Sequence, residues 1–276
     1  MRILVPTDFS KCADDALHAA IDICRKLKGH LHLYHSAQVP DNWEYLDVEA
    51  KVKDTVNKQV ALQAREALKK RQKIAENEGV ECDIHYTGGK FLQNFNEVLE
   101  KVNVDLIVMG SFGTSGKREW FIGSNTQKVV RKFHKNVLVI KQEVQSHLFR
   151  KVVFVSSLNE NDKNTFLRFL DFIRPFDIEE LHLLAVNLGG YFLQPTVVMK
   201  EVLKDFKDLA KGFNCLTHFY QDYSVEAGIR HFCEENDIDL IGISNETRSP
   251  IKRILLGSNV EMVVNHASIP VLSLDK

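Results

Sequence analysis

Residues 104–113 read Val-Asp-Leu-Ile-Val-Met-Gly-Ser-Phe-Gly, and nine residues later the chain continues with Gly123-Ser124 and a helix-like stretch. The apolar part of this sequence predicts a buried strand. In an α/β protein, a glycine-bearing loop that leaves the carboxyl end of a strand and enters a helix can hold a phosphate. This stretch therefore predicts both the class of the fold and the position of a ligand site.

A weaker copy of the same stretch recurs in the second half of the chain. Residues 238–244 read Ile-Asp-Leu-Ile-Gly-Ile-Ser, and they lead to Gly257-Ser258 as residues 104–110 lead to Gly123-Ser124. In this copy serine and threonine stand where the first copy has the loop glycines. We infer a tandem repeat in which only the first copy keeps its glycines.

The chain of 276 residues is long enough for two domains, each with its own core. Hydrophobic residues make up 44% and charged residues 26%, which is the usual balance of a globular protein. We predict domains at residues 1–141 and 151–276, joined by a short polar linker. Continuous apolar strands alternate with helical patterns in both halves, which favours doubly wound α/β domains with parallel sheets.

Charge and cysteine usage argue against several classes of function. The 36 basic and 37 acidic residues give a net charge of -1, so no overall field attracts nucleic acid or an anionic membrane. The five cysteines form no CxxC pair, which argues against a disulfide framework and a zinc site. The apolar start is too short for a signal peptide, and no apolar run approaches the roughly 20 residues of a membrane span. We expect a cytoplasmic protein with no membrane or nucleic-acid partner.

The first half carries a long charged helical pattern, ending near Glu78, that is shortened in the second half. Aligning Ile3 with Val152 gives an offset of 149, whereas aligning Gly123 with Gly257 gives 134, so the second copy has lost about fifteen residues. A helix of this length would reach ~45 Å, against ~20 Å for a typical strand. We expect it to overhang the sheet or to break near its start.

The loop glycines suit close approach of a phosphate. Gly110, Gly113 and Gly116 carry no Cβ that would keep a ligand away from the backbone. Gly123 and Ser124 open the next helix, where the serine hydroxyl and N–H could bind the same anion.

A simpler role is open for the two serines that open these helices. Ser124-x-x-Gln127 and Ser258-x-x-Glu261 both match capping boxes. A serine N-cap stabilises its own helix by about 1 kcal/mol without any ligand. The two roles are not exclusive, and we expect nucleotide binding in the first copy and capping alone in the second.

The loop does not match two commoner nucleotide motifs. Gly110-x5-Gly116-Lys117 has one residue too many for a P-loop, and Arg118 stands where that motif needs serine or threonine. The turn after the first strand, Pro6-Thr7-Asp8-Phe9-Ser10, carries no GxGxxG fingerprint. These departures disfavour a P-loop NTPase and a Rossmann dehydrogenase.

Together, the opening Ile-Leu-Val-Pro-Thr-Asp of residues 3–8, the spacing Gly-x2-Gly-x9-Gly-Ser and Val-Leu-Val-Ile at 137–140 resemble the universal stress protein family. The resemblance covers nearly the whole chain as a tandem pair. It implies two five-stranded parallel sheets of order 3-2-1-4-5, an adenine nucleotide alpha hydrolase-like fold, and a cytoplasmic stress-response protein. It also implies ATP, with or without Mg²⁺, across the carboxyl ends of the strands.

The same resemblance assigns the phosphates to the loop glycines and Ser124, the ribose or a metal to Asp8, and the adenine to the backbone around Ser36. In the second copy Ser157 replaces Asp8, which argues against ATP there. The full predicted set of nucleotide-binding residues is Pro6, Thr7, Asp8, Ser36, Met109, Gly110, Gly113, Gly116, Gly123, Ser124 and Asn125.

Two other groups of side chains could serve a ligand. Lys117 and Arg118 lie in the loop, where a cation could neutralise a triphosphate, although a solvated charge pair is the simpler interpretation. His30, His32 and His35 fall on one strand, where alternate positions share a face, so a metal has to be considered. Because no carboxylate or thiol lies near them in the sequence, we expect packed or surface histidines and no metal.

No Ser-His-Asp order, paired carboxylate motif or HExxH can be recognised, so no catalytic residue is nominated. We predict an ATP-binding regulator with at most slow ATP hydrolysis. The alternative is a nucleotide-free tandem module that acts by binding partners. An adenylate-processing enzyme would need a glycine- and serine-rich loop after the first strand, which Pro6-Thr7-Asp8 does not provide.

Val137–Ile140 and Val271–Leu274 are apolar strands of the kind that needs covering. In the family that the chain resembles, the last strands of two copies commonly pair edge to edge. We therefore predict an internal pseudo-dimer through these two strands. Further association into a homodimer is left open.

Overall fold

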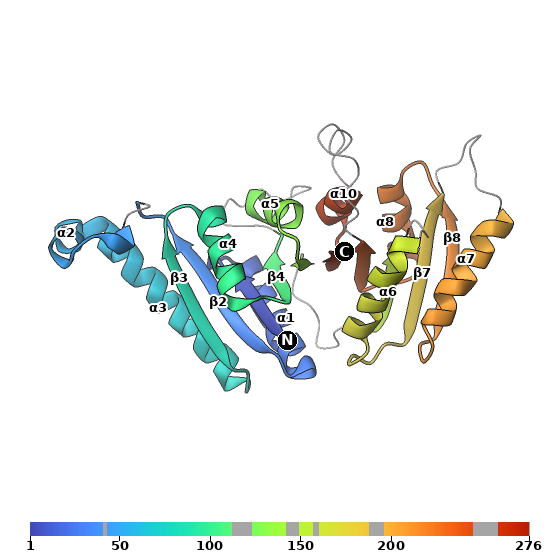
Figure 1. Cartoon of the computed structure of the whole chain (residues 1–276), viewed down its shortest axis with the longest axis horizontal. Coiled ribbons are helices and arrows are strands. Elements are labelled where there is room, and N and C mark those ends of the chain that lie inside the picture. Colours follow the sequence, from blue (N-terminus) through green and yellow to red (C-terminus); the bar gives the residue numbers. More distant parts are fainter. Residues whose placement is uncertain are drawn as a thin grey trace. The chain divides into compact units, whose positions relative to one another are not determined.

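The computed structural model describes residues 1–40, 43–111, 123–141, 149–156, 160–187, 196–244 and 259–275. These residues fall into two compact units, which divide between residues 135 and 136. Figure 1 follows the chain through both units by colour. The strands of each unit are mainly parallel, as the alternation of strands and helices predicts.

The first unit contains a parallel sheet in the order β3-β2-β1-β4. The chain moves to one side of β1 through β2 and β3, and to the other side through β4. The point between β1 and β4 where the direction reverses is where open α/β sheets bind ligands. The strands are β1 (Arg2–Pro6), β2 (His30–Ala37), β3 (Cys82–Gly88) and β4 (Leu106–Gly110).

Helices connect these strands and bury their apolar faces against them. In the first helix, small residues such as Ala16 and Ala20 are fully buried, so the helix packs closely on β4. Ser10 caps its start by accepting a hydrogen bond from the Ala13 N–H. A longer helix runs alongside β2 and β3 (Figure 1). The helices are α1 (Lys11–Leu27), the 3-10 turn η1 (Trp43–Tyr45), α2 (Val48–Lys53), α3 (Thr55–Asn77), α4 (Phe91–Val102) and α5 (Ser124–Lys132).

The second unit has the strand order β5-β10-β9-β6-β7-β8. Counted within the second repeat, β8-β7-β6-β9-β10 is the predicted order 3-2-1-4-5. Its strands are β5 (Asn136–Ile140), β6 (Lys151–Val155), β7 (Glu180–Asn187), β8 (Cys215–Gln221), β9 (Leu240–Ser244) and β10 (Val271–Leu274). The helices are α6 (Glu160–Ile173), α7 (Thr196–Leu209), α8 (Val225–Glu235) and α10 (Asn259–His266).

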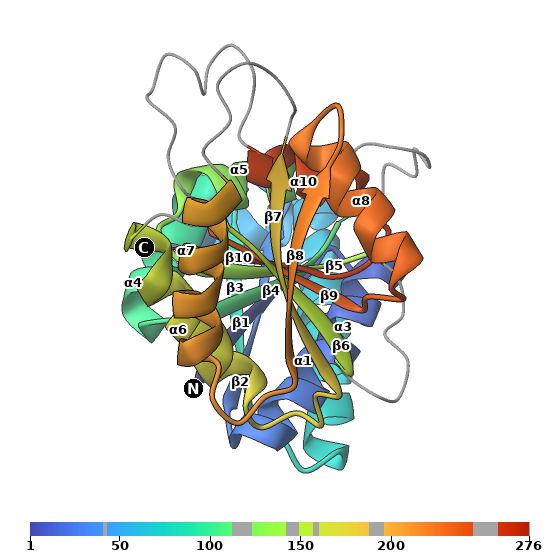
Figure 2. The same cartoon turned by 90° about the vertical axis from the view of Figure 1, so that its right-hand side faces the viewer.

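Helices cover both faces of this second sheet. Figure 2 shows α6 and α7 on one side of β7 and β8, and α8 on the other side. The inner strands β6 and β9 are almost wholly buried, whereas most residues of β8 are exposed or half-buried. Burial on both faces explains why β6 and β9 read as continuous apolar runs in the sequence.

The strands β5 and β10 pair with each other in antiparallel register, with Val271 opposite Val139 and Leu272 opposite Leu138. Both strands belong to the second compact unit. The pairing of Val137–Ile140 with Val271–Leu274, which the family resemblance and the apolar character of both strands predicted, is therefore found. It removes two exposed strand edges that would otherwise template association with other chains.

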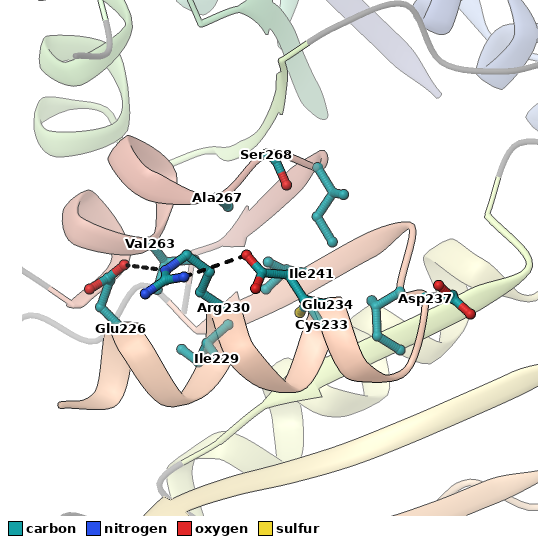
Figure 3. Close-up of a pocket in the computed structure, with 12 residues that line it drawn as sticks. Glu226, Ile229, Arg230, Cys233, Glu234, Asp237, Ile241, Val263, Ala267 and Ser268 are labelled. Carbon is teal, nitrogen blue, oxygen red and sulfur yellow. Dashed lines mark hydrogen bonds and ion pairs between the residues drawn. The ribbon is translucent and has the colours of Figure 1, made fainter. Parts of the chain in front are cut away.

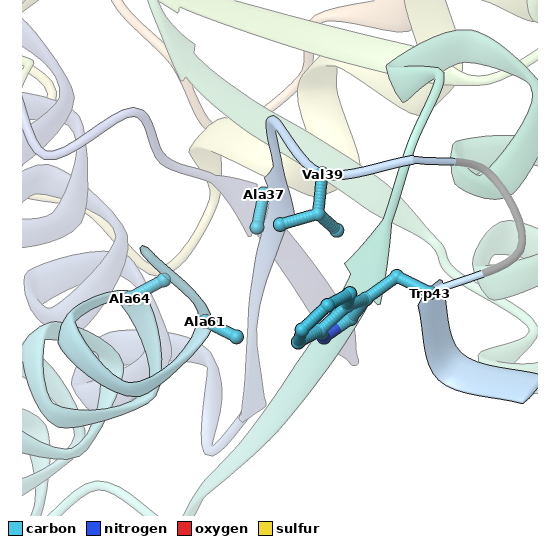
Figure 4. Packing of buried hydrophobic residues seen from close by; sticks show 5 residues of the cluster. All are labelled: Ala37, Val39, Trp43, Ala61 and Ala64. Carbon is cyan, nitrogen blue, oxygen red and sulfur yellow. The ribbon is translucent and has the colours of Figure 1, made fainter. Parts of the chain in front are cut away.

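The long helical pattern of the first half breaks near its start, which is one of the two outcomes expected from its length. The break lies at Asp54, whose carboxylate accepts a hydrogen bond from the Asn57 N–H and so caps α3. A buried tryptophan fixes this region. Figure 4 shows Trp43 packed near Ala37 and Val39, at and just after the end of β2, and near Ala61 and Ala64 of α3. The cluster ties the first turns of α3 to the end of β2.

Among the described residues, no helix combines the length and the apolar character that a membrane crossing needs.

Candidate functional site

A cavity of about 830 Å³ opens at the carboxyl ends of the strands in the first unit. It lies beside the reversal point between β1 and β4, because the residues after β1 and at the end of β4 both line it. Nine predicted residues are brought together in its wall, whereas Gly113 and Gly116 fall outside the described residues. The nine are Pro6, Thr7, Asp8, Ser36, Met109, Gly110, Gly123, Ser124 and Asn125.

Helix α5 begins in this cavity without a side-chain cap. Its N-cap residue is Gly123, whose N–H donates to the Ser111 carbonyl and which has no side chain to offer. Ser124 lies one position inside the helix, so the capping box predicted for Ser124 and Gln127 is wrong. The reason is that the helix starts one residue earlier than the motif implies. The capping box predicted at Ser258 falls outside the described residues.

The uncapped start leaves the first N–H groups of α5 without an acceptor from the N-cap residue. Helix α4, which also begins at the cavity, has no side-chain cap at Lys90 either. By contrast, α1, α2, α3 and α8 all have a serine or aspartate that accepts from their first turn. N–H groups that face a cavity without such a partner favour an anionic ligand.

The glycine at position 110 has a packing role that sequence analysis did not assign to it. A Cβ on Gly110 would lie 2.7 Å from the Cys12 carbonyl oxygen and 2.8 Å from its carbon. This glycine therefore allows α1 to approach β4, whatever it does for a ligand. The Gly110 carbonyl accepts a hydrogen bond of 2.9 Å from the Thr126 hydroxyl, which ties the end of β4 to α5.

The turn after β1 forms a rigid wall of the cavity. Thr7 is buried, its N–H donates to the Tyr34 carbonyl, and its hydroxyl accepts from the Phe9 N–H. The exposed Asp8 carboxylate accepts from the Ser10 N–H at 3.1 Å. Phe9 has a φ of 66°, which is unusual for a bulky residue and common at functional sites.

Phe9 is held in this conformation by side chains from two other elements. Its ring stacks on His35 of β2 with 4.3 Å between the ring centroids. The Arg71 guanidinium of α3 lies 4.8 Å from the Phe9 ring and donates to the Phe9 carbonyl. Arg71 also makes a bidentate ion pair with Asp14 of α1. Its Nε donates to Asp14 Oδ1 at 2.6 Å and its Nη2 donates to Asp14 Oδ2 at 2.8 Å. One arginine therefore joins α3, α1 and the turn.

The protonation of His35 follows from its surroundings. Its Nδ1 lies 2.7 Å from the Thr7 carbonyl oxygen, so it carries the proton and donates it there. Burial lowers the pKa of His35 below its usual 6.5, although the Thr7 hydrogen bond and the Asp8 charge oppose that shift. A neutral His35 with its proton on Nδ1 presents an acceptor nitrogen at Nε2.

The far end of the cavity lies over β2 and β3. The Ser36 hydroxyl donates to the Gly89 carbonyl at 2.9 Å, and the Gly89 N–H donates to the Ala37 carbonyl. Gly89 has a φ of 96°, so it turns the chain sharply from β3 toward α4. The polar side chains of Gln38 and Gln63 also line this end.

Several lining residues were missed by sequence reasoning. The glycine pair Gly88-Gly89 at the end of β3 was a usable signal, because glycines also stand at the end of β4 and in the loop that follows it. The lining residues of α3 gave no such signal, because the sequence of a charged helix does not reveal which of its faces turns toward the strands. The missed residues are Phe9, Ala13, His35, Gln38, Val60, Gln63, Ala64, Ala67, Gly89, Phe91 and Thr126.

The second repeat carries polar side chains at the corresponding positions. The strand registers place Ser156 where the first repeat has Thr7, and Ser244 where it has Gly110. Ser244 is buried, and the Ser156 hydroxyl donates to the buried Asp162 carboxylate at 2.8 Å. At the position of Gly110 the second repeat therefore carries a buried side chain, whereas Thr7 and Ser156 are both hydroxyl residues. Ser157 lies outside the described residues.

A second, smaller cavity of about 210 Å³ lies between α8 and α10 of the second unit. Figure 3 shows Arg230 at its rim, paired with Glu226 and Glu234. Cys233 lines the interior, and burial raises the pKa of its thiol to about 12, so it stays protonated. Typical ligand sites are roughly 300–1,000 Å³, so this cavity is too small for a nucleotide.

Comparison with known proteins agrees with this fold. A model of the universal stress protein family matches residues 1–141 and 163–274. Universal stress protein MJ0531 of Methanocaldococcus jannaschii is 30% identical over 142 residues, covering 51% of this chain and 82% of the relative. Universal stress protein Slr1230 of Synechocystis sp. is 28% identical over 193 residues, covering 69% of this chain and 63% of the relative.

A solved structure extends the likeness to the whole chain. The crystal structure of a universal stress protein from Archaeoglobus fulgidus DSM 4304 superposes with a TM-score of 0.78. It covers 99% of this chain and 98% of that protein, at 18% sequence identity. At this identity the likeness shows the fold alone.

Proposed function

We propose that this chain, which belongs to the universal stress protein family, binds one ATP in the cavity of its first unit and acts as a nucleotide-responsive regulator. The observation that carries the proposal is the start of α5. It opens into a cavity of about 830 Å³ with a glycine at its N-cap. We also propose that the two domains of the chain span residues 1–141 and 151–276.

The phosphates are assigned to the N-terminus of α5. Its first N–H groups carry the positive end of the helix dipole, which favours a negatively charged ligand. The hydrogen bond from Gly123 to Ser111 and the one from Thr126 to Gly110 hold this end against β4. The donors are therefore fixed before a ligand arrives, which lowers the entropic cost of binding.

The nucleoside is assigned to the other end of the cavity. Asp8 suits the ribose hydroxyls or a Mg²⁺ ion, because a carboxylate can accept hydrogen bonds or bind a hard cation. The apolar Val60 and Ala64 of α3 offer a surface for a flat base, and Gln38 and Gln63 can bond to its edge. These groups support a nucleotide better than inorganic phosphate, which would fill only one end.

A regulatory role is favoured over catalysis. His35 is the histidine in the cavity wall, and its Nδ1 proton is committed to the Thr7 carbonyl. Among the described lining residues, no serine or cysteine forms a hydrogen bond with a histidine that could activate it. We expect ATP hydrolysis to be slow at most. A nucleotide-free interaction module is the second candidate, supported by the polar side chains of the second repeat.

Equilibrium dialysis of the full chain against ATP tests this function. We expect one ATP per chain, because within the described parts of the chain the large cavity with an uncapped helix start lies in the first repeat. The substitution Ala67→Phe should reduce binding at least tenfold by filling the cavity from α3, whereas the exposed Leu62→Ala on the same helix should not. No binding by the parent protein, or two ATP per chain, would contradict the proposal.

A further inference from the structure

Three ionisable side chains meet at the opposite end of the strands from the cavity. His30 and His32 lie at the start of β2, and Asp83 lies on the neighbouring strand β3, directly opposite His32 in the register. The cavity residue Ser36 stands near the other end of β2. Because strands rise roughly 3.3 Å per residue, the two places are about 13–20 Å apart along the strand.

The three groups converge on one small region. The distance from His30 Nε2 to Asp83 Oδ2 is 3.0 Å, and from His32 Nδ1 to the same oxygen it is 3.8 Å. The rings of the two histidines stack with 4.7 Å between centroids. Among the described residues, this is the group of histidine, cysteine and acidic side chains whose ligand atoms all lie within 4.8 Å of one another.

Burial prepares His32 to act as a ligand. Its side chain is 9% exposed, whereas Asp83 is 62% exposed and gives the group access from solvent. The His32 Nε2 atom is buried without a hydrogen-bond partner. A buried polar atom without a partner calls for an explanation, and an imidazole nitrogen is a common metal ligand.

Further groups stand around these three. His30 Nδ1 lies 3.4 Å from Glu81 Oε2, so the nitrogen that points away from Asp83 faces a carboxylate. A carboxylate on the second nitrogen orients a metal-binding histidine and raises its basicity. His85 Nε2 lies 3.1 Å from His32 Nδ1 and is the nearest candidate for an additional ligand.

The second repeat provides a natural comparison. There His182 Nδ1 lies 3.0 Å from His218 Nε2, in the same register as the pair of His32 and His85. The histidine pair is therefore common to both repeats and needs no metal to explain it. At the positions of His30 and Asp83, however, the second repeat has Glu180 and Leu216. Glu180 meets His182 at Nε2, whereas His218 meets it at Nδ1, the other ring nitrogen. Among the described residues, three ligand atoms therefore converge in the first repeat and not in the second.

We propose that His30, His32 and Asp83 bind a divalent transition metal ion, with Zn²⁺ as the best chemical match. Two imidazoles and one carboxylate suit zinc, and three protein ligands leave a fourth position for water or for His85. The expectation of packed histidines without a metal rested on the lack of a nearby carboxylate in sequence. Asp83 supplies that carboxylate from the next strand, 53 residues away from His30. His35, by contrast, stacks on Phe9 in the wall of the nucleotide cavity.

Zinc titration of the full chain, freed of metal and nucleotide and followed by competition with a chromogenic chelator, tests the site. We expect one equivalent to bind, with at least tenfold weaker binding in His30→Gln and in Asp83→Asn. Both positions are partly exposed, so these variants should fold. His18→Gln, which removes an exposed histidine of α1, is the matched control and should bind as the parent does. No one-to-one binding, or equal affinity in all variants, would overturn the proposal.

Transplanting the set into the second repeat gives an independent test. The double substitution Glu180→His with Leu216→Asp places the missing groups beside His182, and we expect a second zinc equivalent. Ring nitrogen chemical shifts should identify His30 and His32 as ligands in the parent, with His182 and His218 unchanged. Shifts confined to the second repeat, or to His18, would rule the site out. Neither measurement uses ATP, so this result is independent of the proposed nucleotide function.

Discussion

Replacing Gly123 with aspartate separates the stability of α5 from its proposed ligand. Gly123 has φ −57° and ψ 142°, a backbone conformation that any residue can adopt. An aspartate at this N-cap accepts from the first-turn N–H groups and complements the helix dipole. Together with the lower entropy of the unfolded chain, this should stabilise the protein by about 0.5–1.5 kcal/mol.

The same carboxylate should oppose ATP. The carboxylate and a bound phosphate would compete for the same N–H groups, which places their charges within about 5 Å of each other. Two unit charges at that distance repel by about 3 kcal/mol at an effective dielectric constant of about 20, and by about 1 kcal/mol in bulk water. Because the cavity opens to solvent, we expect ATP affinity to fall by between about fivefold and about 150-fold.

The assay is equilibrium dialysis with ATP, beside urea unfolding of the same samples. Gly123→Asn serves as the matched control, because it caps the helix without adding charge. ATP affinity should fall only a few-fold in Gly123→Asn. The difference in affinity between the two variants then measures the effect of the added negative charge. A Gly123→Asp protein that is more stable and still binds ATP as tightly as the parent would refute the placement of the phosphates.

Three further outcomes follow from the same geometry. Gly110→Ala forces a Cβ against the Cys12 backbone and should cost about 1–3 kcal/mol in urea unfolding; an unchanged midpoint would contradict the packing role. Arg71→Met removes the ion pair with Asp14, so it should lower the free energy of unfolding by about 1–3 kcal/mol and weaken ATP binding. Lys11→Ala removes an exposed ion pair and should lower the same free energy by under about 1 kcal/mol. Burial lowers the pKa of His182 and of His218 below 6.5, so the folded form favours the neutral rings. The contribution of these rings to the free energy of unfolding is complete above pH 6.5 and is lost as the pH falls below that value. Urea unfolding at pH 7.5 and 5.5 should detect this loss, and the loss should be smaller in His182→Gln.

The fold could be predicted because each of its signals is local. Apolar runs such as residues 104–109 and the alternating helix patterns specify strands and helices over a few turns of chain. The repeat then adds a second, independent view of the same pattern. The capping box at Ser124 failed for a related reason: a motif of four residues does not say whether the helix begins at the serine or one residue before it.

The walls of the candidate site could not be predicted, because they depend on which residues meet across long separations. Arg71 reaches Asp14 over 57 residues and Phe9 over 62. Both contacts depend on how α3 is rotated about its axis. The long charged pattern ending near Glu78 gives no sign of this rotation, which is fixed by the cap at Asp54 and the Trp43 cluster.

The histidines of β2 show the same limit within one strand. Their sequence spacing puts His30 and His32 on one face of the strand and His35 on the other, since side chains alternate. The partners of each face come from elsewhere: Asp83 and His85 from β3 for the first two, and Phe9 from the turn after β1 for the third. A carboxylate lies beside the pair His30 and His32, and an aromatic ring lies beside His35. The same residue type therefore has different chemistry on the two faces of β2. Only the register of β2 against β3 reveals which of them can share a metal ion.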